Sequence, residues 1–193
     1  MTLKSPFNHE ERKYMETYKE FEIRVKKNFE NHVATMKDNG EVKILDWQNP
    51  PSCIYAMQFM IRGRHLFVTG DCRNAIYSWS DYIDFDFLRT CDIDYFYSKL
   101  NSLESPRPRE WDNEKAMNSL KEFLESSGFS DNDEILEEAS GASFSNSDWT
   151  SFLDEHSELD GLYNAGNTIP LLVKYHLAGL HLAIENWQNN TKK

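Results

Sequence analysis

The fold is indicated most clearly by residues 53–79, which read CIYAMQFMI-RGR-HLFVT-GDCRN-AIYSW. Three short runs rich in apolar, aromatic and β-branched residues, at 53–61, 65–69 and 75–79, are separated by two segments that contain glycine. Such runs are typical of buried strands, and glycine supplies the positive φ that tight turns require. With a further strand expected at 42–47, the sequence predicts an antiparallel meander of three or four strands.

The segment before the meander has a helical period. Asn8 and Glu11 have the spacing of a capping box, in which each side chain satisfies a backbone amide of the other, and Asn39-Gly40 is typical of a helix end. The sequence predicts one long amphipathic helix over residues 9–37, which covers one face of the meander. Its apolar positions are Tyr14, Tyr18, Phe21, Val25, Phe29, Val33 and Met36.

The chain after Trp79 is predicted to be helical. The run Ser-Pro-Arg-Pro-Arg at 105–109 favours extended backbone and indicates a linker. The predicted subdomains are therefore residues 1–104, helix plus antiparallel sheet, and 105–193, acidic and helical; the fold class is α+β. Helices are expected at 93–103, 112–126, 131–139, 147–156 and 169–188, the last being the central helix of the second half because it is apolar on more than one face.

Cysteine usage and hydropathy bear on the cellular location. Cys53, Cys72 and Cys91 form no C-x-x-C motif and have no histidine at zinc-ligand spacing, so reduced, buried thiols are expected. No apolar run approaches the roughly 20 residues that a bilayer span requires, and the first 21 residues contain no apolar leader core. A cytoplasmic location, without membrane contact, is the resulting prediction.

The formal net charge of −11 is unevenly distributed. Residues 104–160 carry 4 basic and 16 acidic side chains, a net charge of −12, so almost all of the excess lies in this one segment. Nucleic-acid binding depends on Lys and Arg displacing counterions from phosphates. Direct binding of DNA or RNA through this acidic segment is therefore not expected.

The sequence lacks the common motifs of nucleotide-dependent enzymes and hydrolases, and none of its six histidines forms a ligand pair, so no cofactor and no metal are predicted. An enzymatic alternative stays open. Aspartates between residues 71 and 94 supply oxygen atoms of the kind that a divalent cation prefers, although Asp84 and Asp92 also fit as helix N-caps. The candidate ligands are Asp71, Asp81, Asp84, Asp86, Asp92 and Asp94.

The densest acidic stretch is the candidate partner-binding site. A solvated face that keeps the protein in solution is one interpretation. The other is a docking surface, because the charges are concentrated in one subdomain and aromatic residues at positions 129 and 144, and two tryptophans, are expected to be exposed beside them. The candidate site residues are Asp131, Asp133, Glu134, Glu137, Glu138, Trp111 and Trp149.

Two stretches carry a family resemblance. YAMQFMIRGRHLFVTGD at 55–71, continuing through AIYSW at 75–79 to Tyr95-Phe96 and Lys99, resembles small accessory proteins of phages and prophages, and HLAGLHLA at 176–183 is similar to their last helix. Some such proteins are anti-CRISPRs, acidic inhibitors that occupy the nucleic-acid or PAM-binding surface of an effector nuclease. The resemblance covers about a third of the chain and carries no catalytic motif.

Charge and resemblance lead to one functional hypothesis. An acidic surface that repels nucleic acid is complementary to a basic protein surface. We therefore expect an inhibitor from a phage or mobile element, which binds a basic nucleic-acid-handling protein and blocks its nucleic-acid site, with a CRISPR effector nuclease as the leading candidate. The alternative is a divalent-metal-dependent nuclease or phosphoesterase that uses the carboxylates of residues 71–94.

Overall fold

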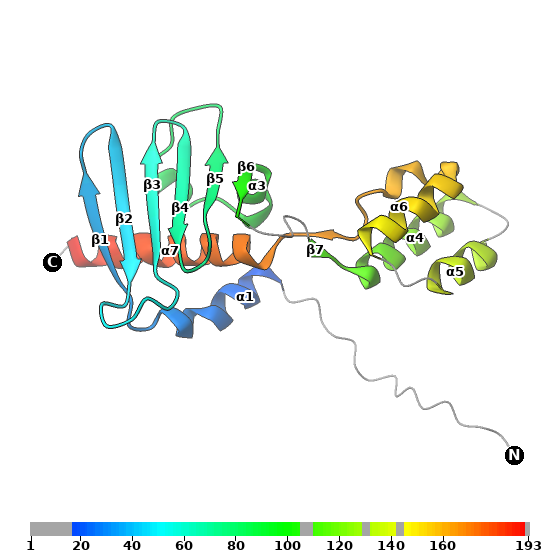
Figure 1. Cartoon of the computed structure of the whole chain (residues 1–193), viewed down its shortest axis with the longest axis horizontal. Coiled ribbons are helices and arrows are strands. Elements are labelled where there is room, and N and C mark those ends of the chain that lie inside the picture. The colour runs from blue at the N-terminus through cyan, green and yellow to red at the C-terminus, as the bar shows by residue number, and fades with distance from the viewer. Residues whose placement is uncertain (1–16, 105–109, 129–131, 142–144, 192–193) are drawn as a thin grey trace, which may run out of the picture.

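The computed structural model describes residues 17–104, 110–128, 132–141 and 145–191, and the fold is α+β (Figure 1). Its main sheet has six strands, each antiparallel to its neighbours, in the order in which they occur along the chain. The strands are β1 (Val33–Asp38), β2 (Val42–Gln48), β3 (Met57–Arg62), β4 (His65–Gly70), β5 (Ala75–Ser78) and β6 (Leu100–Leu103).

The predicted meander is confirmed as β2 to β5. Buried and exposed side chains alternate along its strands. In β3, Met57, Phe59 and Ile61 are buried, whereas Gln58 and Arg62 are exposed. Successive side chains of a strand point to opposite faces, so one face of the sheet joins the core and the other meets solvent. The sheet is larger than predicted because a strand is added at each edge.

The long N-terminal helix is wrong in its second half. Helix α1 spans Tyr18–Val25 and continues as a 3-10 turn, η1 (Lys26–Phe29), and residues 33–38 are then strand β1. β1 pairs with β2 over its whole length, and this ladder outweighs a local apolar spacing that suits a helix. Asn39-Gly40 forms the β1–β2 turn, with Gly40 at φ 79°. Residues 9–16 of the prediction lie outside the described residues.

The predicted helix at 93–103 is only half correct. Two short helices follow the meander, α2 (Phe85–Leu88) and α3 (Ile93–Ser98), and the chain then turns back as β6 beside β5. Asp84 and Asp92 are their N-caps, as the sequence indicated: each carboxylate accepts a backbone N–H bond of 2.8 Å.

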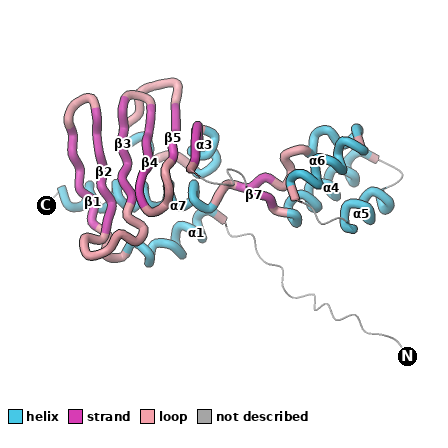
Figure 2. The backbone as a smooth tube through the Cα atoms, in the orientation of Figure 1, coloured by secondary structure: helices cyan, strands magenta, loops and turns pink. Residues whose placement is uncertain are grey.

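The C-terminal helix α7 (Leu171–Thr191) lies across the inner face of the main sheet, and α1 packs against α7 (Figure 2). Its buried side chains, such as Val173, Leu177 and Ile184, belong to the same core as Phe59 and Val68 of the strands. The expectation that this helix is central to the second half of the chain is therefore wrong. The apolar positions of this helix were predicted correctly, but the helix packs against the sheet.

A polar pair inside this core joins α7 to the sheet. His176 is fully buried; its Nδ1 lies 2.8 Å from the Tyr77 hydroxyl and its Nε2 lies 2.8 Å from the carbonyl oxygen of Cys72. A carbonyl only accepts, so Nε2 carries the proton and Nδ1 accepts from the hydroxyl. Burial lowers the pKa of His176 from 6.5 to about 4. The imidazole is thus a neutral structural link inside the core.

The remaining described residues build a separate helical unit with its own core, which Figure 1 shows beyond the sheet. In this unit, β7 (Glu110–Trp111) and β8 (Asn167–Thr168) pair as a short antiparallel two-stranded sheet. The predicted helices are confirmed, and the proposed boundary near residue 105 lies outside the described residues. The helices are α4 (Asn113–Ser127), α5 (Asn132–Gly141), α6 (Asn146–Glu155) and the 3-10 segment η2 (Ser157–Leu162).

Gly70 is expected to tolerate no side chain. It ends β4 at φ 125°, and a Cβ there would collide with the carbonyl oxygen of Ala56. We expect Gly70→Ala to lower the free energy of unfolding by about 2–4 kcal/mol, measured by urea denaturation, because strain and collision act together. Gly40→Ala is the matched control, since Gly40 also has positive φ but nothing lies within 4 Å. Equal losses in the two variants would contradict the collision.

Candidate functional site

The acidic residues of α5 occupy its outward side. Asp133, Glu134, Glu137 and Glu138 are exposed, whereas Ile135 and Ala139 of the same helix are buried in the core of the helical unit. A helix places residues four apart on one side, so the carboxylates form two adjacent pairs, 133 with 137 and 134 with 138. We call these four residues the acidic face. Asp131, the fifth predicted member, lies outside the described residues.

The acidic face has opposite effects at the two ends of its own helix. Asp133 and Glu134 lie in the first turn of α5, where the helix dipole favours anions. Like charges four residues apart destabilise a helix by a few tenths of a kcal/mol per pair. Glu137 and Glu138 also lie toward the C-terminal end of α5, where the helix dipole favours cations. The helix sequence NDEILEEASG contains no Lys or Arg to offset them. Helix formation therefore accounts for Asp133 and Glu134 but does not explain Glu137 and Glu138.

Neighbouring side chains contact only part of this face. Glu138 Oε2 lies 3.2 Å from His156 Nε2, and the other ring nitrogen of His156 lies 3.5 Å from Glu158. For Asp133, Glu134 and Glu137, no ion pair with another described residue is formed. Lys115, a basic residue of the same helical unit, donates from Nζ to the carbonyl oxygen of Asn167 at 2.7 Å and forms no ion pair with the acidic face. Three carboxylates of the acidic face are left to solvent or to a partner.

The two tryptophans predicted beside the acidic face differ in burial. Trp149 is 0% exposed, and its Nε1 donates to the carbonyl oxygen of Leu162 at 2.9 Å. The prediction that Trp149 is an exposed anchor is therefore wrong. Trp111 is half-buried, packs 5.8 Å from the Trp149 ring and donates from Nε1 to Asn113 at 2.7 Å. The aromatic residues at 129 and 144 lie outside the described residues.

The carboxylates of residues 71–94 do not gather into a site. Asp71 accepts the backbone N–H of Tyr55 at 2.7 Å, and Asp86 accepts from the Gln188 amide at 2.8 Å. Asp84 and Asp92 cap helices, as described above. Over the described ranges, no group of three or more His, Cys, Asp or Glu residues is placed to hold a metal ion. The aspartates of this segment therefore act locally on the backbone and on α7.

The three thiols are not equivalent. Cys72 and Cys91 are buried, as predicted, but Cys53 is exposed and corrects the expectation for all three. Burial raises the pKa of Cys72 to about 11, with a smaller contribution from the charge of Asp71, and burial likewise raises the pKa of Cys91 to about 11. Since the thiolate is the nucleophile, neither buried thiol is suited to catalysis near neutral pH.

Thiol titration tests this difference. With Ellman's reagent at about pH 8, we expect one thiol of the folded protein to react fast and all three to react in denaturant, because Cys53 is exposed whereas burial shields Cys72 and Cys91 and raises their pKa values. Cys53→Ser should remove the fast phase. Fast reaction of Cys72 or Cys91 in the folded protein would contradict the burial described here.

Sequence patterns gave no signal for a hollow of about 520 Å³ beside the edge of the main sheet. Its buried side is formed by Phe29, His32 and Trp47, whose rings lie 5.2 to 6.1 Å apart. Helix α7 supplies the opposite side through Leu182 and neighbouring residues. We call it the Trp47 pocket. Its residues come from three distant segments, so no local motif marks it.

Comparisons with known proteins bring no assignment. No protein-family model matches the chain, and neither a curated protein nor a solved structure matches it. The described residues include no helix that is long and apolar enough to cross a membrane. The stretches that carry the resemblance form β3 to β5 and the middle of α7, and so lie in the sheet unit, away from the acidic face.

Proposed function

We propose that this protein is an inhibitor from a phage or other mobile element, which binds a basic, nucleic-acid-handling protein and denies it its substrate. The observation that carries this proposal is the acidic face of α5. Its two like-charge pairs repel each other, Glu137 and Glu138 lie where the helix dipole disfavours anions, and three of the four carboxylates have no ion pair with a described residue. A positively charged partner surface would supply the missing counter-charges.

The sign of the charge selects the class of partner. Residues 104–160 carry a net charge of −12, which repels phosphate backbones and attracts the Lys- and Arg-lined grooves that bind them. An acidic helix in such a groove would compete directly with nucleic acid. A CRISPR effector nuclease is the leading candidate because of the family resemblance given above, and the charge argument alone extends to other basic nucleic-acid-binding proteins.

The burial of Trp149 changes which residues are proposed to contribute affinity for the partner. That ring holds the helical unit together and makes no direct contact with a partner. Trp111 keeps part of its surface exposed and stays a proposed contact, although it lies on β7 and not on the helix that carries the four carboxylates. Charged groups at the rim of an interface govern the rate of encounter more than they govern affinity. The acidic face should therefore act mainly on association.

Affinity purification from a bacterial lysate, followed by mass spectrometry, tests the proposal. The tagged full chain is compared with Asp133→Lys/Glu134→Lys/Glu137→Lys, which spares Glu138 because that residue contacts His156. We expect a basic nucleic-acid-binding protein on the wild-type chain that resists nuclease treatment and is lost from the variant. Recovery of no such protein, or the same protein on both chains, would leave the acidic face with a solubilising role only.

A further inference from the structure

The Trp47 pocket contains a buried polar group without a partner. Trp47 is 3% exposed, and its Nε1 has no hydrogen-bond acceptor among the described residues. An indole N–H only donates, and a buried donor left unpaired costs about 1–3 kcal/mol. Buried polar groups are nearly always paired, so this N–H indicates that an acceptor is supplied from outside the chain.

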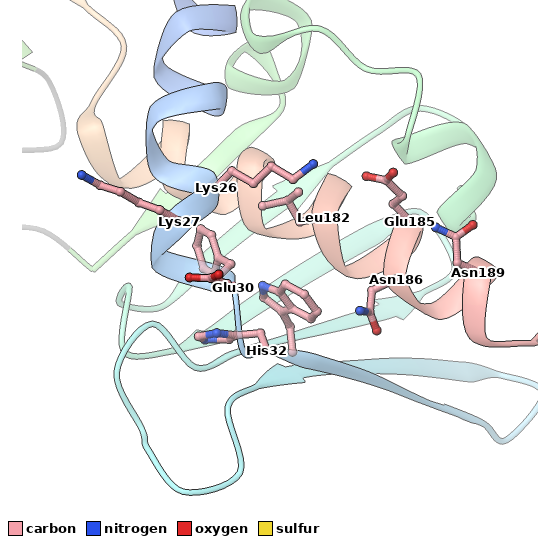
Figure 3. Close-up of a pocket in the computed structure, with 10 residues that line it drawn as sticks. Lys26, Lys27, Glu30, His32, Leu182, Glu185, Asn186 and Asn189 are labelled. Atoms are coloured by element: carbon pink, nitrogen blue, oxygen red, sulfur yellow. The ribbon is translucent and has the colours of Figure 1, made fainter.

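The opening of the pocket carries charged residues of both signs, namely Lys26, Lys27, Glu30 and Glu185. Figure 3 shows Lys26 reaching across the hollow toward α7, where Glu185 lies beside Asn186 and Asn189. Lys26 and Glu185 are exposed, and neither forms an ion pair with a described residue. Figure 3 shows Lys27 and Glu30 directed away from α7, so Lys26 and Glu185 are the cation and the anion that face a ligand from opposite sides.

The inner wall is apolar and uncharged. Phe29 and Trp47 are both 3% exposed, and burial lowers the pKa of His32, so this ring is neutral near neutral pH. The hollow of about 520 Å³ falls within the roughly 300–1,000 Å³ of small-molecule sites, which are mostly apolar with a few placed polar groups. This volume favours a ligand with a large ring over one with a short aliphatic group.

We propose that the Trp47 pocket binds a free aromatic α-amino acid. The ring of the ligand enters the apolar part, its carboxylate meets Lys26 and accepts from Trp47 Nε1, and its ammonium group meets Glu185. Lys26 and Glu185 are long and exposed, so they can move to admit the ligand to the buried N–H. The site lies in the sheet unit and does not depend on the function proposed for the acidic face.

Titration of L-tryptophan into the ¹⁵N-labelled full chain, followed by NMR, tests the proposal. The indole N–H signal of Trp47, assigned as the one missing in Trp47→Phe, should move downfield as it gains an acceptor, while the signals of Trp111 and Trp149 stay in place. Binding by Trp47→Phe should be about 3- to 10-fold weaker, which corresponds to one hydrogen bond.

Ligand analogues and charge variants separate the two charges. Tryptamine lacks the carboxylate and indole-3-propionate lacks the ammonium group, so each should bind several-fold more weakly than L-tryptophan. Lys26→Ala should weaken L-tryptophan but not tryptamine, Glu185→Gln should weaken L-tryptophan but not indole-3-propionate, and Lys121→Ala on the helical unit should change nothing. The proposal is overturned by unchanged spectra at millimolar L-tryptophan, L-tyrosine and L-phenylalanine, or by binding of both analogues as tight as that of L-tryptophan. A response to adenosine, which has a ring but no α-amino acid group, with none to the amino acids would also overturn it.

Discussion

Replacing Trp149 by alanine is expected to lower the free energy of unfolding of the helical unit by about 3–5 kcal/mol, the usual loss for a fully buried tryptophan. The side chain is 0% exposed, lies 5.6 Å from the Phe152 ring and donates to the carbonyl oxygen of Leu162. Denaturation followed by circular dichroism would measure the loss. Native-state hydrogen exchange would locate it, because amides of 113–162 should lose protection.

Two comparisons sharpen this prediction. Trp149→Phe keeps most of the ring but leaves the Leu162 carbonyl without its donor, so a smaller loss of about 1–3 kcal/mol is expected. The strands of the main sheet belong to a different core and should keep their protection in both variants. A loss below about 1 kcal/mol for Trp149→Ala, or equal loss of protection in the sheet, would contradict the two-core description.

Acid should destabilise the protein through His176. The folded-state pKa is about 4 and the unfolded value is 6.5, so between these values the unfolded chain binds more protons. Stability is therefore complete above about pH 6.5 and falls as the pH decreases to 4, by roughly 3 kcal/mol in all. The measurement is the free energy of unfolding from urea titrations across this range, taken as the difference between wild type and a non-titrating variant.

His176→Gln is that variant, because its amide can still donate to Cys72 and accept from Tyr77. Subtraction removes the carboxylates that titrate in the same range. His176→Leu leaves both partners unpaired and should cost about 2–5 kcal/mol even at neutral pH. His65→Gln, outside the network, should follow the wild type. A pH dependence shared by wild type and His176→Gln would show that this imidazole does not titrate as described.

The fold could be predicted as far as local patterns carry it. β2 to β5 were found because short runs rich in apolar, aromatic and β-branched residues are separated by turn residues such as glycine. β1 was missed because Val33 and Met36 fit a helical spacing as well as a strand, and only the partner strand decides between them. The four residues of β6 are too short to interrupt a helical pattern. α7 was found, but an amphipathic pattern shows only that one face of a helix is buried. It does not show which element packs against that face.

The same division holds for the candidate sites. The acidic face is contiguous in sequence and could be located from charge alone. The burial of Trp149 had a signal, since Trp149, Phe152 and Leu153 have the spacing of one helix face, but the aromatic residue was read as an anchor. The Trp47 pocket joins residues 26–32, 47 and 182–189, which only the folded chain brings together.

The association rate with the recovered partner tests the central claim most directly. At about 0.1 M salt, where screening extends roughly 10 Å, Asp133→Lys/Glu134→Lys/Glu137→Lys should associate at least about tenfold more slowly than the wild-type chain. At about 1 M salt, where the screening length falls to roughly 3 Å, the two association rates should converge, and the dissociation rates should be similar at both salt concentrations.

Glu41→Lys/Asp81→Lys/Asp94→Lys is the control. It changes the net charge by the same amount on the exposed surface of the sheet unit and should associate nearly as fast as the wild type. Equal low-salt rates for the wild-type chain and the α5 variant, or equal slowing by the control, would contradict the proposal that the acidic face steers this protein to its partner.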